Sequence, residues 1–252
     1  MIEEKVSVIV PTYNSSKYVL ETLKSIKNQT YKNWELLITD DCSTDDTVDI
    51  INSFIKNDER IKLFKLDNNS GAAAARNHSI YQAKGRYIAF CDSDDRWKTN
   101  KLEVQIAYMK EHDCGFSYTS YDIINESGKS IGTSVAKPTI NYKKILRNNY
   151  VGCLTAIYDT NIYGKLYMPK IRKRQDWALW ILILQKSNKA CGLNQVLATY
   201  MQRKNSISSN KFEMLKYNFN IYFHFLKLNR VKSFFYMIRF VFYFLRYKKL
   251  GY

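Results

Sequence analysis

Three aspartates within four residues are the part of this sequence with the clearest capacity for chemistry. Asp92, Asp94 and Asp95 directly follow a short apolar run, Tyr87–Phe90. Carboxylates this close repel one another, so the cluster is favourable only beside a cation or a substrate. Hard divalent cations fit it best, because Mg²⁺ and Mn²⁺ commonly bridge protein carboxylates to substrate phosphates. The alternative is a solvated acidic turn that caps the next helix.

The first hundred residues alternate between strand and helix patterns. Strands are predicted at residues 6–10, 34–38, 61–66 and 87–90, and helices at 18–26, 45–55 and 72–83. Ser43 or Thr44 is the expected N-cap of the second helix. The alternation predicts an α/β fold with a mostly parallel, Rossmann-like sheet flanked by helices.

Polar residues follow three of these predicted strands. Thr12 comes after the first strand, Asp40 and Asp41 end the second, and the acidic cluster follows the fourth. Ligands of open α/β sheets bind beyond the carboxyl ends of the strands. We therefore expect these residues to lie at one edge of the sheet, which favours the metal and phosphate interpretation over a solvated turn.

The second half of the chain has a different pattern. It predicts a hairpin of residues 116–124 and 130–135, a helix at 176–185, a strand at 196–200, and helices at 211–228 and 231–247. The chain has 39 basic and 23 acidic residues, a net charge of +16, so an anionic partner is expected. From Thr199 onward there are 11 Lys and Arg residues against Glu213 alone, which marks the C-terminal part as an appendage.

The five cysteines show no metal-ligand spacing, so a structural zinc site is not expected and reduced thiols are the default. The first residues lack the basic region of a signal peptide. No apolar run reaches the roughly 18 residues of a membrane-spanning helix. We therefore expect a cytoplasmic location.

Four segments in order resemble the family 2 glycosyltransferases with the GT-A fold. They are Val6–Asn14, Asp40–Ser43, Asn69–Asn77 and Asp92–Asp95, and Arg174–Trp177 is similar to the family's acidic catalytic motif. The resemblance implies a catalytic domain at residues 1–210, with a nucleotide-sugar-binding half (1–97) and an acceptor half (98–210). Residues 211–252 form a basic aromatic helical tail, which the general family pattern does not cover.

The resemblance implies a role for each residue of the donor site. Pro11, Thr12 and Tyr13 would frame the nucleotide base, and Asp41 would accept the N3–H of uracil. Arg76 would lie near the base or the phosphates. Asp92, beside Ser93, would contact the ribose. Asp94 would hold Mn²⁺ or Mg²⁺, with help from Asp95, and the metal would bridge the phosphates of a nucleotide-sugar, most simply a UDP-sugar.

The resemblance also implies the catalytic group. Asp176 would be the general base of an inverting transfer, which needs one carboxylate to take the proton of the acceptor hydroxyl. Gln175 departs from the family pattern, where an acid often precedes the base. Trp177 is a candidate to stack on an acceptor sugar, whereas Trp180 is expected in the core. The basic run Lys170 to Arg174 either adds phosphate contacts or is a solvated loop.

The tail combines aromatic and basic residues in a way that is typical of a helix at a membrane interface. Lys232, Arg239 and Arg246 fall on one helical stripe with Tyr236 and Tyr243, amid apolar residues. We expect the stripe to face anionic headgroups and the flanks to enter the lipid boundary. The alternatives are packing on the catalytic domain or an oligomer interface. A nucleic-acid partner is not expected, because no recognition motif is present.

The resemblance thus implies an inverting, metal-dependent glycosyltransferase of bacterial surface-polysaccharide synthesis. Its acceptor would be a lipid-linked saccharide at the cytoplasmic face of the plasma membrane. One alternative is a sugar nucleotidyltransferase, but the Gly-rich phosphate loop of that class is missing after the first strand. Another is a nucleotide-sugar-binding protein without turnover.

Overall fold

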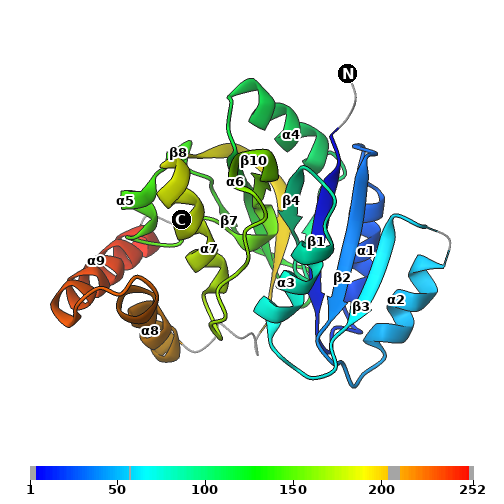
Figure 1. The fold of residues 1–252 in the computed structure, drawn as a ribbon, viewed down its shortest axis with the longest axis horizontal. Helices are drawn as coiled ribbons and strands as arrows, with labels where there is room; N and C mark the ends of the chain where they lie inside the picture. The colour runs from blue at the N-terminus through cyan, green and yellow to red at the C-terminus, as the bar shows by residue number, and fades with distance from the viewer. Residues whose placement is uncertain (1–3, 57, 204–210, 250–252) are drawn as a thin grey trace.

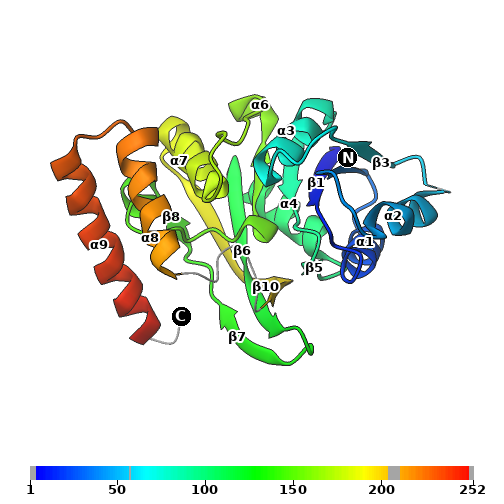
Figure 2. The same ribbon diagram turned by 90° about the horizontal axis from the view of Figure 1, so that it is seen from below.

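A mixed sheet with helices on both faces forms the centre of the molecule in the computed structural model (Figures 1 and 2). The structure describes residues 4–56, 58–203 and 211–249. The strands are β1 (Val6–Thr12), β2 (Trp34–Asp40), β3 (Ile61–Lys65), β4 (Tyr87–Phe90), β5 (Arg96–Trp97), β6 (Phe116–Asn125), β7 (Ser130–Ser134), β8 (Thr139–Ile140), β9 (Ile157–Asp159) and β10 (Ala190–Gln202). The helices are α1 (Val19–Lys27), α2 (Thr47–Ile55), α3 (Ala72–Gln82), α4 (Lys101–Glu111), α5 (Tyr142–Ile145), α6 (Thr160–Tyr163), α7 (Gln175–Ser187), α8 (Lys211–Asn220) and α9 (Arg230–Lys249). The described residues also include a 3₁₀ turn, η1 (Cys153–Thr155), and a π turn, η2 (Ile221–Phe225).

The sheet changes character at β4. Its order is β3-β2-β1-β4-β9-β6-β10-β5, with β7 paired to β6 and β8 to β10. Strands β3, β2, β1 and β4 are parallel to one another, and β9 runs antiparallel to both β4 and β6. Every residue of β1, β2 and β4 is buried, as expected for parallel strands covered on both faces. The predicted α/β fold, and the hairpin of β6 and β7, are confirmed.

The start of α2 differs from the sequence prediction. The N-cap position belongs to Asp46, and neither Ser43 nor Thr44 caps the helix. Ser43 instead donates to Asp40 Oδ1 at 2.5 Å, and the Thr44 amide donates to Asn14 Oδ1 at 2.9 Å. The predicted caps are wrong because these two residues serve the loops at the strand ends.

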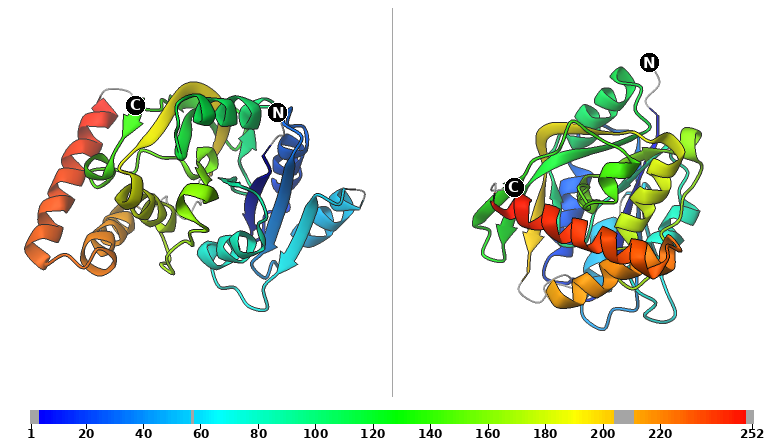
Figure 3. Two further views of the ribbon diagram at one scale, coloured as in Figure 1. Left: turned by 45° about the horizontal axis from the view of Figure 1, so that its top comes forward. Right: turned by 90° about the vertical axis from the view of Figure 1, so that its left-hand side faces the viewer.

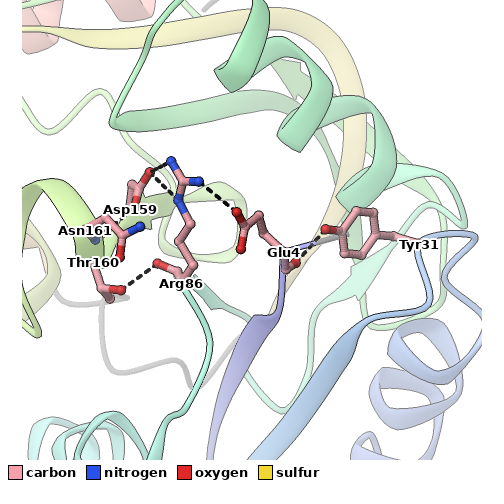
Figure 4. Close-up of polar contacts among 6 residues, drawn as sticks. All are labelled: Glu4, Tyr31, Arg86, Asp159, Thr160 and Asn161. Carbon is pink, nitrogen blue, oxygen red and sulfur yellow. Dashed lines mark hydrogen bonds and ion pairs between the residues drawn. The ribbon is translucent and has the colours of Figure 1, made fainter. Parts of the chain in front are cut away.

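An ion-pair network lies at the opposite end of β4 from the acidic cluster (Figure 4). Arg86 Nη2 and Nε donate to Asp159 Oδ2 at 2.8 and 3.0 Å, and Arg86 Nη1 donates to Glu4 Oε1 at 3.0 Å. Asp159, the last residue of β9, also accepts the Asn161 amide at the start of α6. The network therefore ties the antiparallel strand β9 to the start of β4.

Cys114 and Cys191 form a disulfide with a Cα–Cα distance of 6.4 Å. The prediction that all thiols are reduced is therefore wrong for this pair. The two residues are 77 positions apart, and they meet because β10 pairs with β6 at Cys191 and Ser117. Sequence spacing cannot reveal such a contact, which depends on the order of the strands.

The two tail helices, α8 and α9, pack against the rest of the structure at one end of the molecule (Figure 3). The Trp177 ring contacts the rings of Tyr222 and Phe240, with centroids 5.8 and 5.6 Å apart. Tyr222 Oη donates to the Leu146 carbonyl at 2.8 Å. Packing on the catalytic domain, one of the alternatives for the tail, thus holds for one face of α9.

The opposite face of α9 is apolar and exposed. Its side chains are between 54% and 80% exposed and are spaced along one side of the helix: Val231, Phe234, Phe235, Ile238, Phe242 and Leu245. Tyr236 stacks on Tyr222, and Tyr243 Oη accepts from Arg147 Nη1 at 3.2 Å. The prediction that these tyrosines face the headgroups is therefore wrong, because they face the body of the protein. Among the described residues, no helix is long and apolar enough to span a membrane.

Lys101 at the start of α4 is a buried cation with an expected effect on stability. Its Nζ donates to Gln105 Oε1 at 2.7 Å and lies 4.3 Å from the centroid of the Trp97 ring. Burial lowers the pKa of Lys101 to about 7, from an ordinary value of 10.5. Between pH 7 and 10.5 the unfolded chain therefore binds more protons at this lysine than the folded chain does, so stability rises with pH across this window.

Replacing Lys101 with methionine is expected to reduce this rise in the free energy of unfolding between pH 7 and pH 10. The wild-type rise from this lysine is on the order of 1.4 kcal/mol per pKa unit. The variant also loses the hydrogen bond to Gln105 Oε1, which lowers its stability at every pH. The readout is therefore the slope of the free energy of unfolding against pH and not its absolute value. Urea unfolding at both pH values measures it, with the exposed Lys98→Met as the matched control. Equal slopes in the wild type and in Lys101→Met would show that the lysine is charged in the fold.

Candidate active site

Hydrogen bonds join the ends of three strands into one site. Thr12 and Asp40 are opposite each other at the ends of β1 and β2, and Thr12 Oγ1 donates to Asp40 Oδ1 at 2.9 Å. After β1 and β4, Ser15 Oγ and Ser93 Oγ are 2.7 Å apart. The predicted meeting of polar strand ends at one edge of the sheet is confirmed. Tyr13, after Pro11 and Thr12, is 48% exposed beside them.

Asp41 fixes the loop that precedes α3. Its Oδ1 accepts the Ser70 amide at 2.7 Å, and its Oδ2 accepts the Gly71 amide at 2.8 Å. Gly71 has a φ of 88°, in the left-handed region that favours glycine. Each carboxylate oxygen has a second lone pair, so recognition of uracil by Asp41 stays a prediction.

Arg76 of α3 and Asp92 form an ion pair below the strand ends. Arg76 Nη2 donates to Asp92 Oδ1, and the arginine is 6% exposed. Burial disfavours the charged form of Arg76, but the negative charges of Asp92 and, more weakly, Asp176 outweigh burial and raise its pKa. Arg76 Nε is buried and has no hydrogen-bond partner in the described protein. Helix α3 thus places a cation beside the acidic cluster, and this cation has one N–H group still able to donate a hydrogen bond.

Asp94 pairs with Arg203, a residue to which the sequence assigned no role. The distance from Arg203 Nε to Asp94 Oδ2 is 2.7 Å. Burial raises the pKa of Asp94 to about 6, the charge of Arg203 opposes the rise, and that of Asp92 adds to it. Arg203 lies just beyond β10, 109 positions from Asp94 in the sequence, so nothing near the acidic cluster indicates the pair.

Asp95 is directed into the protein. It is 1% exposed, and its Oδ1 accepts the amide of Met201 in β10 at 3.0 Å. Burial and the charges of Asp94 and Asp92 raise the pKa of Asp95 well above its usual value. These contacts favour a positioning role, in which Asp95 holds the end of β10 and thereby Arg203. Its predicted role as a second metal ligand stays a prediction.

The donor atoms at this edge fit a metal that is shared with a substrate. Within the described ranges, no group of three or more His, Cys, Asp and Glu side chains is arranged to hold a metal ion. The side chain of Asp94 is 13% exposed and that of Asp92 32% exposed. One or two carboxylates suit Mg²⁺ or Mn²⁺ when phosphate oxygens and water supply the other ligands. A metal held by protein alone does not fit these residues.

Asp176 approaches the same site from α7. Arg174 precedes the helix in the left-handed conformation, with a φ of 67°, and Asp176 lies in the first turn. Asn149 Nδ2 donates to Asp176 Oδ2 at 3.0 Å and orients the carboxylate. The negative charge of Asp176 acts on Arg76 and on Cys153. Asp176 therefore lies near enough to Arg76 for the two charges to interact, and Asn149 is a further residue that the sequence did not indicate.

The two tryptophans of α7 are both in the core. Trp177 is 0% exposed, and its Nε1 donates to the Ile145 carbonyl at 2.9 Å. The prediction that Trp177 stacks on an acceptor sugar is wrong, because its ring is enclosed by the tail. Trp180 is 0% exposed and packs on Phe90 and Phe116, which confirms its expected place.

The basic run before α7 connects to the tail rather than to the acidic cluster. Lys173 Nζ pairs with Glu213 Oε2 at 2.7 Å, and Arg174 Nε donates to Asn218 Oδ1 at 2.8 Å. Both partners lie on α8. The interpretation of this run as phosphate ligands of the donor therefore has no support for Lys173 and Arg174.

The sheet, the acidic cluster after β4 and the separate carboxylate on α7 together define an α/β protein of the GT-A fold. Residues 7–176 match the family model described as Glycosyl transferase family 2. The chain belongs to this family, and it is a glycosyltransferase.

Relatives and solved structures agree with this assignment over most of the chain. The putative teichuronic acid biosynthesis glycosyltransferase TuaG of Bacillus subtilis is 43% identical over 229 residues, which are 90% of this chain and 91% of that protein. The UDP-Glc:alpha-D-GlcNAc-diphosphoundecaprenol beta-1,3-glucosyltransferase WfgD of Escherichia coli is 38% identical over 237 residues, or 94% and 92% of the two chains. The crystal structure of S. aureus TarS 1–349 in complex with UDP superposes with a TM-score of 0.69 at 25% identity, covering 94% of this chain and 70% of that one.

Proposed function

We propose that this glycosyltransferase moves a sugar, with inversion, from a UDP-sugar to a saccharide carried on a lipid diphosphate. The observation that carries the proposal is the arrangement around Arg76. The charges of Asp92 and Asp176 act on its guanidinium, and Arg76 in turn acts on Asp94. The loop after β4, helix α3 and helix α7 thus contribute to one site, which holds the Arg76 guanidinium paired with Asp92 and, separately, the carboxylate of Asp176.

The relatives support the chemical classes of donor and acceptor. WfgD is named for transfer from UDP-Glc to a GlcNAc-diphosphoundecaprenol acceptor, and TarS 1–349 was crystallised with UDP. The name of TuaG refers to teichuronic acid, a surface polysaccharide. A sugar nucleotidyltransferase, one alternative from the sequence, is excluded by the family to which the chain belongs.

Each protein group has a step in the proposed reaction. Asp176 accepts the proton of the acceptor hydroxyl, whose oxygen attacks the anomeric carbon as the bond from that carbon to the diphosphate breaks. A Mn²⁺ or Mg²⁺ ion held by Asp94, when bound, would offset the charge on the departing diphosphate. Arg76 balances the negative charge of Asp92, which is the residue expected to contact the ribose. Because one displacement occurs without a covalent intermediate, an α-linked donor gives a β-linked product.

A screen of nucleotide sugars tests the proposed donor class. Release of UDP is expected from one UDP-sugar at a rate that rises at least tenfold when a GlcNAc-diphospholipid is added. GDP-sugars and CMP-sugars serve as controls and should give background release. Turnover only with a donor other than a UDP-sugar, or release that no lipid-linked acceptor stimulates, would contradict the proposal.

We also propose that the exposed face of α9 rests on an anionic membrane surface at the cytoplasmic side. The face is apolar over its length, and Lys227, Arg230 and Lys232 lie at its beginning. A lipid-linked acceptor presents its saccharide at such a surface, and an amphipathic helix gains from both the apolar contact and the anionic headgroups.

Substituting the face without removing the helix tests this location. A variant with four substitutions, Phe234→Gln, Phe235→Gln, Ile238→Gln and Phe242→Gln, is expected to bind phosphatidylglycerol vesicles at least about tenfold more weakly. Each of these apolar side chains contributes at most about 1.5–3 kcal/mol when it is buried in the lipid. Vesicle co-sedimentation measures the binding. The variant Tyr81→Gln, Ile162→Gln, Tyr167→Gln removes exposed apolar groups elsewhere and should bind as the wild type does. Equal binding by the α9 variant would refute the proposed location.

A further inference from the structure

A cavity of about 390 Å³ lies between the segment before α7 and the tail. Ile171, Arg172 and Lys173 line one side, and Ile221, His224 and Phe225 of η2 line the other. None of these residues belongs to the donor site around Arg76. The cavity is therefore a second concave surface for which the nucleotide-sugar gives no use.

The lining combines basic and apolar residues, and is therefore complementary to an amphiphile with an anionic head group. Arg172 and His224 are exposed at the rim, whereas Ile221 is buried and Phe225 half-buried within. Lys173 adds a second cation beside Arg172, although it is also paired with Glu213. An arginine fork recognises phosphate oxygens with two parallel hydrogen bonds, and the apolar wall suits a hydrocarbon chain.

The position of the cavity connects it to the catalytic carboxylate. Lys173 is three residues before Asp176, a span of about 10 Å at most in an extended chain. Arg174, between them, is fixed to Asn218 of α8 by the hydrogen bond described above. One continuous segment thus lines the cavity at Lys173 and carries Asp176 three residues later, and the tail braces this segment through Asn218.

We propose that this cavity binds the diphosphate and the first isoprene units of the polyprenyl-diphosphate acceptor. The inference rests on the proposed function, which requires such an acceptor but does not place it. Arg172 and Lys173 hold the diphosphate, and Ile221 and Phe225 contact the beginning of the lipid chain. The sugar on the diphosphate then points along the loop toward Asp176, while the rest of the lipid chain leaves toward the apolar face of α9.

Titration of the full chain with farnesyl diphosphate, in EDTA and without UDP, tests the site by calorimetry. Arg172→Glu and His224→Glu are each expected to weaken binding at least tenfold, because both place a negative charge beside the diphosphate. Lys170→Glu is the matched control, since Lys170 is an exposed cation of the same loop that does not line the cavity. Farnesol and inorganic diphosphate should each bind at least tenfold more weakly than farnesyl diphosphate, because each supplies only half of the contacts.

Three outcomes overturn the proposal. The first is equal affinity for farnesyl diphosphate in the wild type and in both cavity variants at unchanged melting temperature. The second is loss of binding in Arg203→Ala, which would place the diphosphate in the donor site. The third is a loss of phosphatidylglycerol-vesicle binding in Arg172→Glu that is as large as its loss of farnesyl diphosphate binding. This result would show that the cavity binds the headgroups of ordinary membrane lipids.

A parallel titration with UDP and Mn²⁺ separates this proposal from the proposed function. The cavity variants are expected to bind UDP as the wild type does and to show a raised KM for the lipid-linked acceptor alone. If the wild type binds no UDP, the proposed function fails, whereas the farnesyl diphosphate titration still decides what the cavity binds.

Discussion

Replacing Asp176 with asparagine is expected to lower kcat for sugar transfer by about 10²–10⁴-fold, the usual contribution of a positioned general base. Asparagine has the same shape but cannot take a proton. It can still meet the side chain of Asn149 after an amide rotation, so the start of α7 keeps its position. The exchange also removes a negative charge near the N-terminus of α7, which stabilises the helix by about 0.3–1 kcal/mol. We expect the folded domain to tolerate this loss of stability.

Two measurements distinguish loss of the base from loss of structure. The affinity for UDP should be unchanged in Asp176→Asn, because this residue acts on the acceptor. Asp113→Asn, at an exposed aspartate in the turn between α4 and β6, controls for the charge change and should retain full turnover. A variant Asp176→Asn with more than a third of the wild-type kcat would remove Asp176 from the mechanism.

Replacing Asp94 with alanine is expected to lower transfer at least about 100-fold and to raise the Mn²⁺ concentration for half-maximal activity. Stabilisation of a leaving diphosphate by a metal is worth several kcal/mol, and each 1.36 kcal/mol is a tenfold change in rate. The side chain of Asp94 is 13% exposed and thus open to a metal ion, and Arg203 loses its partner in the variant. Donor hydrolysis over a Mn²⁺ series, with and without acceptor, measures both quantities.

Asp95→Asn is the informative comparison for Asp94. Asp95 contacts the Met201 amide inside the protein, so its variant should lower the melting temperature and change the Mn²⁺ requirement less than twofold. A Mn²⁺ requirement raised equally in the two variants would make Asp95 a metal ligand, as the sequence predicts. Wild-type activity without any divalent metal would remove the metal role of Asp94.

The sequence predicts the meeting of the polar strand ends well because its signals are local. Apolar runs that end in polar residues define β1, β2 and β4, and the parallel order of these strands places Thr12, Asp40 and Asp92 at one edge. Each side chain is thus positioned by the strand that directly precedes it. No long-range contact has to be known for this part of the prediction.

The partners of Asp94 and Asp176 could not be predicted, because these contacts depend on how distant parts of the chain fold together. Arg203 reaches Asp94 only because β10 crosses to pair with β5 and β6, and Asn149 reaches Asp176 from a loop between α5 and β9. Trp177 has the position of a sugar-stacking residue next to the base, yet the tail covers it. An aromatic residue at the start of a helix looks the same in the sequence whether solvent or another helix lies over it.

The contact of Trp177 with Phe240 makes the tail part of the cooperative unit that unfolds. An anchor that hangs from a domain by a linker can be removed at no thermodynamic cost to the domain. Here the rings of Tyr222 and Phe240 cover the helix that carries Asp176, so thermal unfolding of tail and catalytic domain should occur in a single transition. A shortened chain that ends before α9 would therefore lose activity because the helix of Asp176, the proposed base, loses part of its packing, even with an acceptor that needs no membrane.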